Sequence, residues 1–187
     1  WGGRHTNTFK PVTLPSAWTV PLAEYVGYLI GDGCVREASG PGRMSTASVV
    51  FGTADEAEEL LQRFRTILED MGATAQVVTM SNQTVQLRAN RTPVVRFLKQ
   101  IGVCEVKAPE KVVPNALFEA PHAIVAAFLR GLFTADGCVY DGTKNRYVGL
   151  GSRSLKLLQG VQELLLTFGI TSRIYASDRR AHSAFHY

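Results

Sequence analysis

Apolar residues recur along the chain with two periods, and these periods predict its secondary structure. Residues 22–30 are almost entirely apolar, which predicts a buried helix, and helical spacing of apolar residues over 60–71 predicts an amphipathic helix that ends at Gly72. Strands are expected around residue 35 and over 45–52. Alternation over 75–80 and 84–89 predicts a hairpin, and a last helix is expected over 92–101, ending at Gly102.

The same order of patterns begins again in the second part of the chain. Residues 122–135 predict an apolar helix, and residues 138–140 and 147–151 predict two strands. An amphipathic helix over 154–168 and a strand over 173–176 follow, after which the pattern has no counterpart of the last strand and helix of the first part.

Sequence identity supports this repeat. The segment YVGYLIGDGCV (residues 25–35) matches LRGLFTADGCV (residues 129–139), and VVFGT (49–53) is echoed by VGLGS (148–152). We therefore predict a duplicated mixed α/β (α+β) fold of the order α-β-β-α-β-β-α, with the second copy incomplete at its C-terminus. The expected division is an N-terminal arm or the remnant of a flanking domain over 1–20, a first half over 21–106, a connector over 107–121 and a truncated second half over 122–187.

Composition narrows the class of protein. The 187 residues are 45% hydrophobic and 19% charged, which is typical of a globular protein, and the net charge of +4 is compatible with a nucleic-acid partner. The three cysteines form no CxxC pair, which indicates reduced thiols in an intracellular protein. No apolar stretch predicts a membrane span and no basic-then-apolar start predicts a secretory signal, so we expect a cytoplasmic protein.

Small residues occupy matching positions in the two apolar helices. Gly27 corresponds to Gly131, and Gly31, four residues later, corresponds to Ala135. Residues four apart lie on one face of a helix, so these faces allow two backbones to approach closely. We predict that the two helices pack against each other through Gly27 and Gly131.

That packing would bring two acidic residues together at the helix ends. Asp32 and Asp136 follow Gly31 and Ala135 directly. A carboxylate at a helix C-terminus is unfavourable, and two neighbouring carboxylates repel, so a cation is needed. Carboxylates and the carbonyls of Gly31 and Ala135 are oxygen ligands that suit Mg²⁺. A metal so held can support phosphodiester hydrolysis.

A plainer interpretation is that Gly-Asp-Gly is only a turn that ends an apolar helix. One copy alone would favour the turn. Two copies with the same small-residue spacing and the same Cys-Val after the glycine favour a functional site.

The two motifs resemble those of LAGLIDADG homing endonucleases. FLRGLF (residues 128–133), KVVP (111–114) and FEAP (118–121) are similar to the version found in the endonuclease region of inteins. The resemblance covers residues 21–175, and it implies a pseudo-two-fold fold whose paired strands form saddle-shaped DNA-binding sheets. It further implies that Asp32 and Asp136 bind Mg²⁺ and that Lys111 assists catalysis.

The sequence departs from that family at several points. Ile30 and Thr134 stand at the first acidic position of the motifs, where the family varies widely, and a second catalytic lysine would be expected beyond the last residue. The terminal residues that intein splicing requires are absent, so we do not predict self-splicing. The resemblance implies a monomer with internal symmetry that cleaves double-stranded DNA at a long target site, within a larger intein precursor.

Basic and polar residues on the predicted strands and loops are candidates for contact with DNA. Gln86 and Arg88 share one face of a strand, with apolar residues on the other. Arginine and glutamine read base edges in the major groove, whereas loop arginines and lysines contact phosphate. The candidates are Arg36, Arg43, Ser45, Ser48, Gln86, Arg88, Lys144, Arg146, Arg153 and Arg173.

Two other functions are compatible with parts of this pattern. One is a non-cleaving DNA- or RNA-binding protein of the same fold, such as a transcription regulator or an intron maturase, which loss of the acidic residues would favour. The other is a small-molecule enzyme with paired aspartates as acid and base, which does not explain the duplicated strands. Retention of both Asp32 and Asp136 favours the endonuclease.

Overall fold

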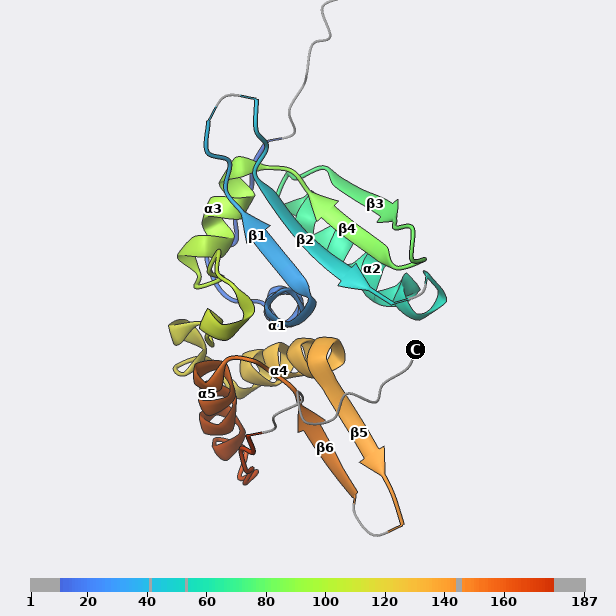
Figure 1. Cartoon of the computed structure of the whole chain (residues 1–187). Coiled ribbons are helices and arrows are strands. Elements are labelled where there is room, and N and C mark those ends of the chain that lie inside the picture. The colour runs from blue at the N-terminus through green and yellow to red at the C-terminus, as the bar shows by residue number, and fades with distance from the viewer. Residues whose placement is uncertain (1–10, 41, 53, 144–145, 177–187) are drawn as a thin grey trace, which may run out of the picture.

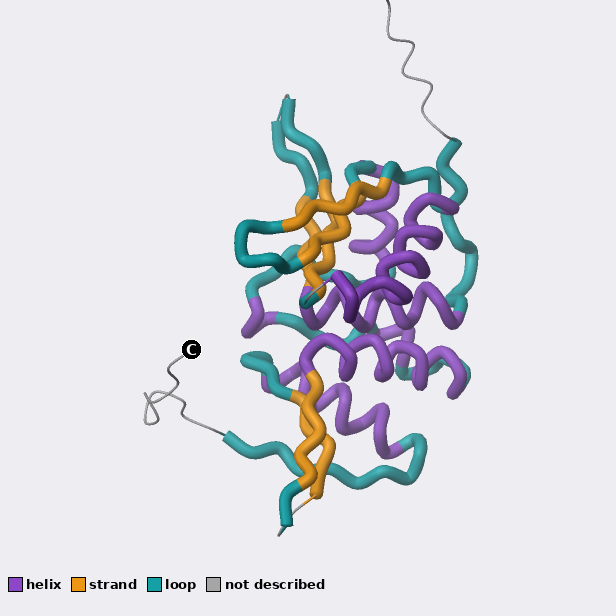
Figure 2. Tube along the Cα trace, turned by 90° about the vertical axis from the view of Figure 1, so that its right-hand side faces the viewer, coloured by secondary structure: helices purple, strands orange, loops and turns teal. Residues whose placement is uncertain are grey.

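Two buried helices form the centre of the molecule. The computed structural model describes residues 11–40, 42–52, 54–143 and 146–176. Helices α1 (Val20–Asp32) and α4 (His122–Asp136) pack against each other, with the strands of the first half above them and those of the second half below them in Figure 1. Figure 2 shows the same helices between the two sets of strands.

The central helices touch through their backbones. A Cβ atom added to Gly27 would overlap the carbonyl oxygen of Phe128, and one added to Gly131 would overlap that of Glu24. Glu24 and Phe128 occupy equivalent places in the repeat, so the contact is two-fold symmetric within one chain. The predicted packing through Gly27 and Gly131 is confirmed.

Each central helix leads straight into a strand. Gly33, which follows α1, has φ −126° and ψ 174°, and Gly137, which follows α4, has φ −83° and ψ 160°. Both are extended conformations, so each helix ends at its Asp-Gly pair without a separate turn before the strand. Glycine is required for space, because a Cβ on Gly33 would lie 2.8 Å from the carbonyl oxygen of Ser48.

The first half is a four-stranded antiparallel sheet covered by helices on one face. Strands β1 (Gly33–Arg36), β2 (Thr46–Phe51), β3 (Ala75–Thr79) and β4 (Val85–Ala89) lie in the order β1-β2-β4-β3. Helices α1, α2 (Ala54–Asp70) and α3 (Thr92–Gln100) pack on the inner face, where Val49, Phe64, Leu87 and Leu98 are fully buried. The predicted helix stops are confirmed, since Gly72 and Gly102 have φ of 82° and 104°.

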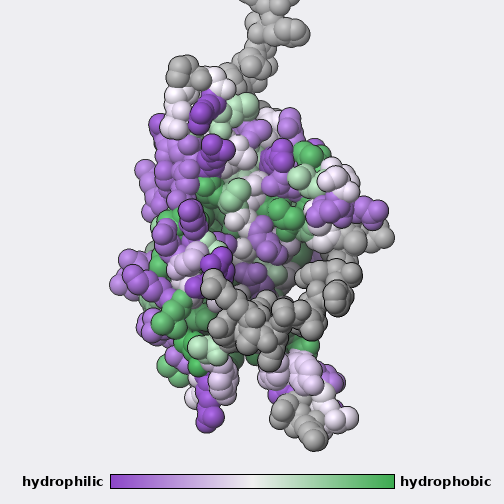
Figure 3. Space-filling model, viewed as in Figure 1, coloured by the Kyte–Doolittle hydropathy of each residue, from purple (hydrophilic) through white to green (hydrophobic). Residues whose placement is uncertain are grey.

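The connector packs against the last helix. It contains two short 3-10 helices, η1 (Ala108–Glu110) and η2 (Asn115–Leu117). Helix α5 (Leu155–Leu166) lies on this segment, and a Cβ on its Gly160 would meet the side chains of Val113 and Phe118. Apolar residues reach the surface around α5, as the lower part of Figure 3 shows; they include Phe118, Leu155 and Leu166.

The second half repeats the central helix and the first hairpin, but no described helix covers this hairpin as helices cover the first sheet. Strands β5 (Gly137–Asp141) and β6 (Arg146–Leu150) pair with each other alone within the described residues. Val139 and Val148 are 79% and 67% exposed, whereas their counterparts Val35 and Ala47 in the first half are buried under helices. The duplicated mixed α/β fold is thus confirmed, with one half barer than the other.

One predicted strand is wrong. Residues 173–176 are irregular and exposed. A strand needs a neighbour to pair with its backbone groups, and no described strand lies in register beside this segment. Over the part of the chain that the structure describes, no helix combines the length and the apolar character that a membrane span requires.

Gly27→Ala and Gly131→Ala are each expected to lower the free energy of unfolding by about 1–3 kcal/mol, because the added methyl group must separate two helix backbones. Chemical denaturation measures the change. Alanine has the better helix propensity by about 1 kcal/mol, so without this contact the substitutions would stabilise the protein. Ala126→Gly, at an exposed position of α4, is the control and should lose only that propensity.

Candidate functional site

The close contact of α1 and α4 brings two carboxylates together. Asp32 and Asp136 are the last residues of these helices, and a Cβ on Gly31 would lie only 3.4 Å from Oδ2 of Asp136. Burial at the helix ends raises the pKa of both carboxyl groups, and the charge of Asp136 raises the pKa of Asp32 further. The site therefore holds two carboxylates in a place that disfavours their charge.

Lys111 from the connector supplies positive charge at this point. Its ammonium nitrogen Nζ donates a hydrogen bond of 2.7 Å to the carbonyl oxygen of Gly31. Its charge lowers the pKa of Asp32 and of Asp136 and so opposes the effect of burial. The prediction that Lys111 lies beside the acidic pair agrees with this arrangement.

Both halves of the chain fix the position of Lys111. The hydroxyl of Ser154, the N-cap residue of α5, donates a hydrogen bond of 2.6 Å to the carbonyl oxygen of Lys111. The same hydroxyl accepts a hydrogen bond from the backbone N–H of Leu157. Ser154 is fully buried, so the anchor of the lysine is part of the core of the second half.

The backbone carbonyls at the helix ends were predicted as further metal ligands. The carbonyl oxygen of Gly31 already accepts one hydrogen bond, from Lys111. A carbonyl oxygen has two lone pairs, so this bond leaves one for another partner. The metal-binding roles of the Gly31 and Ala135 carbonyls stay predictions.

The residues at the site fit a hard divalent cation. Two carboxylates with raised pKa values gain most from a neighbouring positive charge, and oxygen donors suit Mg²⁺, Mn²⁺ or Ca²⁺. In the described part of the chain no cluster of three or more His, Cys, Asp or Glu side chains could hold a metal by itself. Asp32 and Asp136 would thus share the ion with oxygen ligands from outside the chain, such as water or phosphate.

Tyr28 belongs to the surroundings of the site, although its sequence position gave no sign of this. Its hydroxyl donates a hydrogen bond of 3.0 Å to the carbonyl oxygen of Val50. Burial and the charges of Asp32 and Asp136 raise the pKa of Tyr28 to about 12. Tyr28 therefore stays protonated and neutral next to the acidic pair. The signal available from sequence was only its helical spacing of four residues from Asp32.

The outer face of the first sheet is polar, as predicted from the alternation in β4. Arg88 donates a hydrogen bond of 2.6 Å to Oε1 of Gln86, and Gln86 donates one of 3.2 Å to the hydroxyl of Ser48. Arg36 is exposed on β1, whose neighbour Val35 points into the core. Gln76 on β3 is opposite Arg88 and shares this face, a residue that the sequence analysis did not select.

Two of the predicted DNA contacts are wrong because the side chains are buried. Ser45 is 2% exposed; its hydroxyl accepts a hydrogen bond from the N–H of Ala38 and pairs with the hydroxyl of Thr92. Ser48 is 3% exposed beneath Gln86. The sequence could not show this burial, because Cys34 and Gln86 on the two neighbouring strands contact the hydroxyl of Ser48.

The remaining basic candidates are scattered. Arg146 is exposed, but its side chain forms an ion pair of 2.6 Å with Asp141 at the end of the hairpin. Three further arginines are exposed in segments without regular structure; they are Arg43, Arg153 and Arg173. Lys144 lies outside the described residues. Their roles stay predictions.

An ion cluster around the buried Glu24 joins the two halves and was not predicted. Glu24 on α1 is 4% exposed and pairs with Arg63 of α2 at 3.3 Å and with Arg130 of α4 at 2.8 Å. The hydrogen bond and charge of Glu24 raise the pKa of Arg130. Buried carboxylates are stable only with such partners, so the cluster sets how α2 and α4 sit on α1.

Comparison with protein families gives one match that covers most of the chain. The family described as LAGLIDADG-like domain matches residues 20–102 and 123–186. These two ranges contain the two acidic helix ends and leave out the whole connector.

Two relatives with different names each contain a segment that is similar in sequence to this chain. The replicative DNA helicase DnaB of Synechocystis sp. is 28% identical over 80% of this chain and 18% of its own length. The ribonucleoside-diphosphate reductase NrdEB subunit alpha of Bacillus subtilis is 29% identical over 86% of this chain and 15% of its own length. The chain thus spans less than a fifth of either relative.

Solved structures share the fold. The crystal structure of I-DmoI in complex with DNA and Ca has a TM-score of 0.65 and 19% sequence identity, and the match covers 87% of this chain and 78% of that one. At this identity the likeness establishes the fold.

Asp32→Asn is expected to stabilise the metal-free protein at pH 7, because it removes a carboxylate that is repelled by Asp136. The gain in the free energy of unfolding should be at most about 1 kcal/mol, since solvent screens this repulsion. A raised folded-state pKa means that the carboxyl contributes stability at low pH and that this contribution is lost as the pH rises through that pKa. The advantage of the variant should therefore disappear in acid. Thermal unfolding at a series of pH values measures it.

The same measurement with added Mg²⁺ tests the metal site. A concentration of 100 times the Kd should stabilise the wild type by about 2.7 kcal/mol and should leave Asp32→Asn and Asp136→Asn nearly unchanged. Asp70→Asn is the matched control, because Asp70 is an exposed aspartate at the end of another helix. An equal response of all four proteins would show that the ion binds elsewhere or not at all.

Proposed function

The chain belongs to the LAGLIDADG-like domain family, and on that premise we propose that it is a homing endonuclease that cleaves double-stranded DNA at a long target site with the help of a divalent cation. The observation that carries this proposal is the pair Asp32 and Asp136, held together at the helix contact beside Lys111. A chain that only bound DNA would have no need for two carboxylates in a place that disfavours them.

The chemistry follows from the residues at the site. A divalent ion bound there, with Mg²⁺ as our proposal, would polarise a phosphate oxygen and make a bound water a stronger nucleophile. Asp32 and Asp136 would hold that ion through carboxylate oxygens. Lys111 lies on the Gly31 side of the pair, where its ammonium group stabilises negative charge that develops on the phosphate.

The shape of the molecule suits duplex DNA. The sheet β1–β4 and the β5–β6 hairpin lie on opposite sides of the central helices that end at the acidic pair (Figure 1), so each half would address one half of the target, called here the first and second half-site. Arg36, Gln86 and Arg88 carry the donors and acceptors that read base edges in the first half-site. The complex of I-DmoI with DNA and Ca supports this arrangement for the same fold. One chain supplies both acidic residues, so we propose that it acts as a monomer on intracellular DNA.

The relatives support an intein as the source. A helicase and a reductase have no activity in common, yet each contains a segment similar to this chain in less than a fifth of its length. A mobile element inserted into unrelated host proteins explains this distribution. We therefore propose that the chain is the endonuclease region of an intein and that its target is the uninterrupted host gene.

Asp32→Asn and Asp136→Asn are each expected to lower the cleavage rate at least about a hundredfold, because each removes a charged metal ligand at the reacting phosphate. The assay follows conversion of a supercoiled plasmid that carries the uninterrupted host gene, with the full parent protein and Mg²⁺. Asp70→Asn should cleave like the wild type. Tight, selective binding by the wild type without any metal-dependent nicking would favour a non-cleaving DNA-binding protein instead.

Lys111→Met is expected to lower the cleavage rate by about 10²–10³-fold and to change the Kd for DNA little, since the ammonium group acts on charge that appears in the transition state. Rates come from single-turnover cleavage and Kd values from binding in Ca²⁺. Lys107→Met, an exposed lysine of the same connector, is the control. Equal losses in the two variants would assign Lys111 to general attraction of DNA.

A further inference from the structure

We propose that Tyr140 and Tyr147 form an apolar base-reading surface, which recognises the C5 methyl groups of thymine in the major groove of the second half-site. This inference rests on the proposed function and names what the second half of the protein recognises. The two tyrosines are directly opposite each other on β5 and β6, and their rings stack with centroids 5.2 Å apart and an interplanar angle of 23°.

The rings are presented to solvent. Tyr140 and Tyr147 are 51% and 55% exposed, so two large aromatic side chains stand on a two-stranded hairpin with no described element over them. Cross-strand stacking by itself contributes to hairpin stability. Each side chain nevertheless remains about half exposed, so part of both rings is accessible to a ligand.

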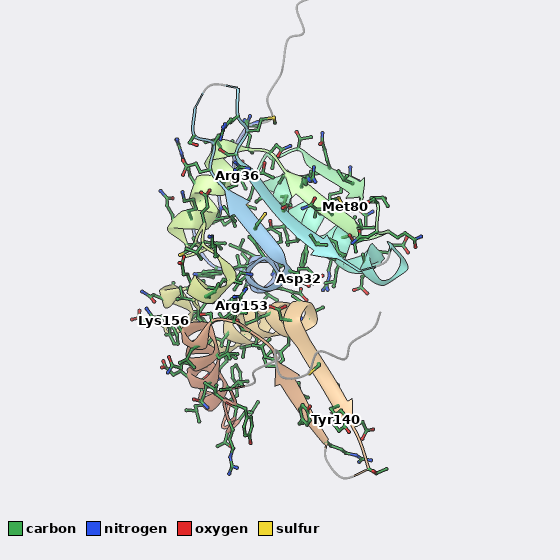
Figure 4. All side chains as sticks on the ribbon, in the orientation of Figure 1. Asp32, Arg36, Met80, Tyr140, Arg153 and Lys156 are labelled. Atoms are coloured by element: carbon green, nitrogen blue, oxygen red, sulfur yellow. The ribbon has the colours of Figure 1, made fainter. Side chains whose placement is uncertain are left out.

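The repeat identifies this surface with the DNA-facing side of the first half. Both hairpins start at the glycine that follows the acidic residue, so the pair Cys34–Ser48 corresponds to Cys138–Gly149. Two residues further along each strand, Arg36 opposite Thr46 corresponds by strand pairing to Tyr140 opposite Tyr147. In Figure 4, Asp32 lies between Arg36 and Tyr140, as expected for equivalent positions on the two half-sites.

The chemistry of this face differs between the halves. Arg36 and the nearby Gln86 and Arg88 offer donors and acceptors, which suit guanine and adenine. At the equivalent place the second half offers two rings, and its ion pair Asp141–Arg146 projects from the opposite face of the hairpin. The apolar group that a major groove presents is the thymine methyl, so the tyrosine pair suits thymine.

Uracil substitution tests the inference directly, because uracil differs from thymine only in the missing methyl group. The bound sequence is first obtained by selection from random DNA with the full parent protein carrying Asp32→Asn, which removes cleavage. Thymines are then replaced by uracil in one half-site at a time. Replacement of each contacted thymine in the second half-site should weaken binding about fourfold, because one buried methyl group is lost. Replacements in the first half-site should have no such effect.

Exchange of the residues between the halves supplies the decisive variant. Tyr140→Arg with Tyr147→Thr places the residues of the first hairpin on the second. The uracil effect should vanish, and the preferred base at the affected positions should change from thymine to guanine. Tyr140→Phe with Tyr147→Phe preserves the rings and should retain the uracil effect, and thermal unfolding shows whether each variant remains folded.

The possible outcomes separate this inference from the proposed function. Selective binding and cleavage with equal affinity for thymine and uracil in the second half-site would overturn the inference and leave the endonuclease intact. A uracil effect that persists in the Arg–Thr variant would also overturn it, since the methyl would then be read by other residues. Absence of any selective DNA binding would overturn both.

Discussion

Contact between two helix backbones is the constraint on which the rest of the structure depends. Gly27 and Gly131 have no Cβ because the carbonyl oxygens of Glu24 and Phe128 occupy that space. Helices this close must end side by side, and their ends carry Asp32 and Asp136. The packing of the two helices therefore also determines how close the two carboxylates lie. Side chains at the crossing would separate the carboxylates, and the site would lose the proximity that favours a shared cation.

The repulsion between the two neighbouring carboxylates is offset by a positive charge that comes from outside the two helices. Lys111 comes from the connector and is held by Ser154 of α5, so the compensating charge depends on correct folding of both halves. The buried Glu24, paired with Arg63 and Arg130, ties α2 and α4 to α1 on another side of the same interface. These charged interactions thus hold elements from the two halves in a fixed arrangement.

The internal two-fold symmetry is clearest at the helix contact around Gly27 and Gly131 and is lost toward the edges. Near the helix contact, residues of the two halves occupy matching places. Farther out, the first half has a four-stranded sheet covered by helices on one face, whereas the second has a hairpin whose Val139 and Val148 are exposed. The faces differ in chemistry as well, with arginine and glutamine on one and stacked tyrosines on the other. Such divergence suits a DNA target whose two halves need not be alike.

The sequence by itself determined the repeat, the order of elements and the pairing of Gly27 with Gly131, because these follow from local periodicity and from the match between the two copies. It also placed Gln86 and Arg88 on one face, since alternation in a strand is a local property. Tertiary structure alone decided that Ser45 and Ser48 are buried, that Gly31 binds Lys111 and that Tyr28 lies near the acidic pair. It also decided that residues 173–176 form no strand. Each of these depends on a neighbour distant in sequence, and periodicity carries no information about which distant residue covers, pairs with or charges a given position.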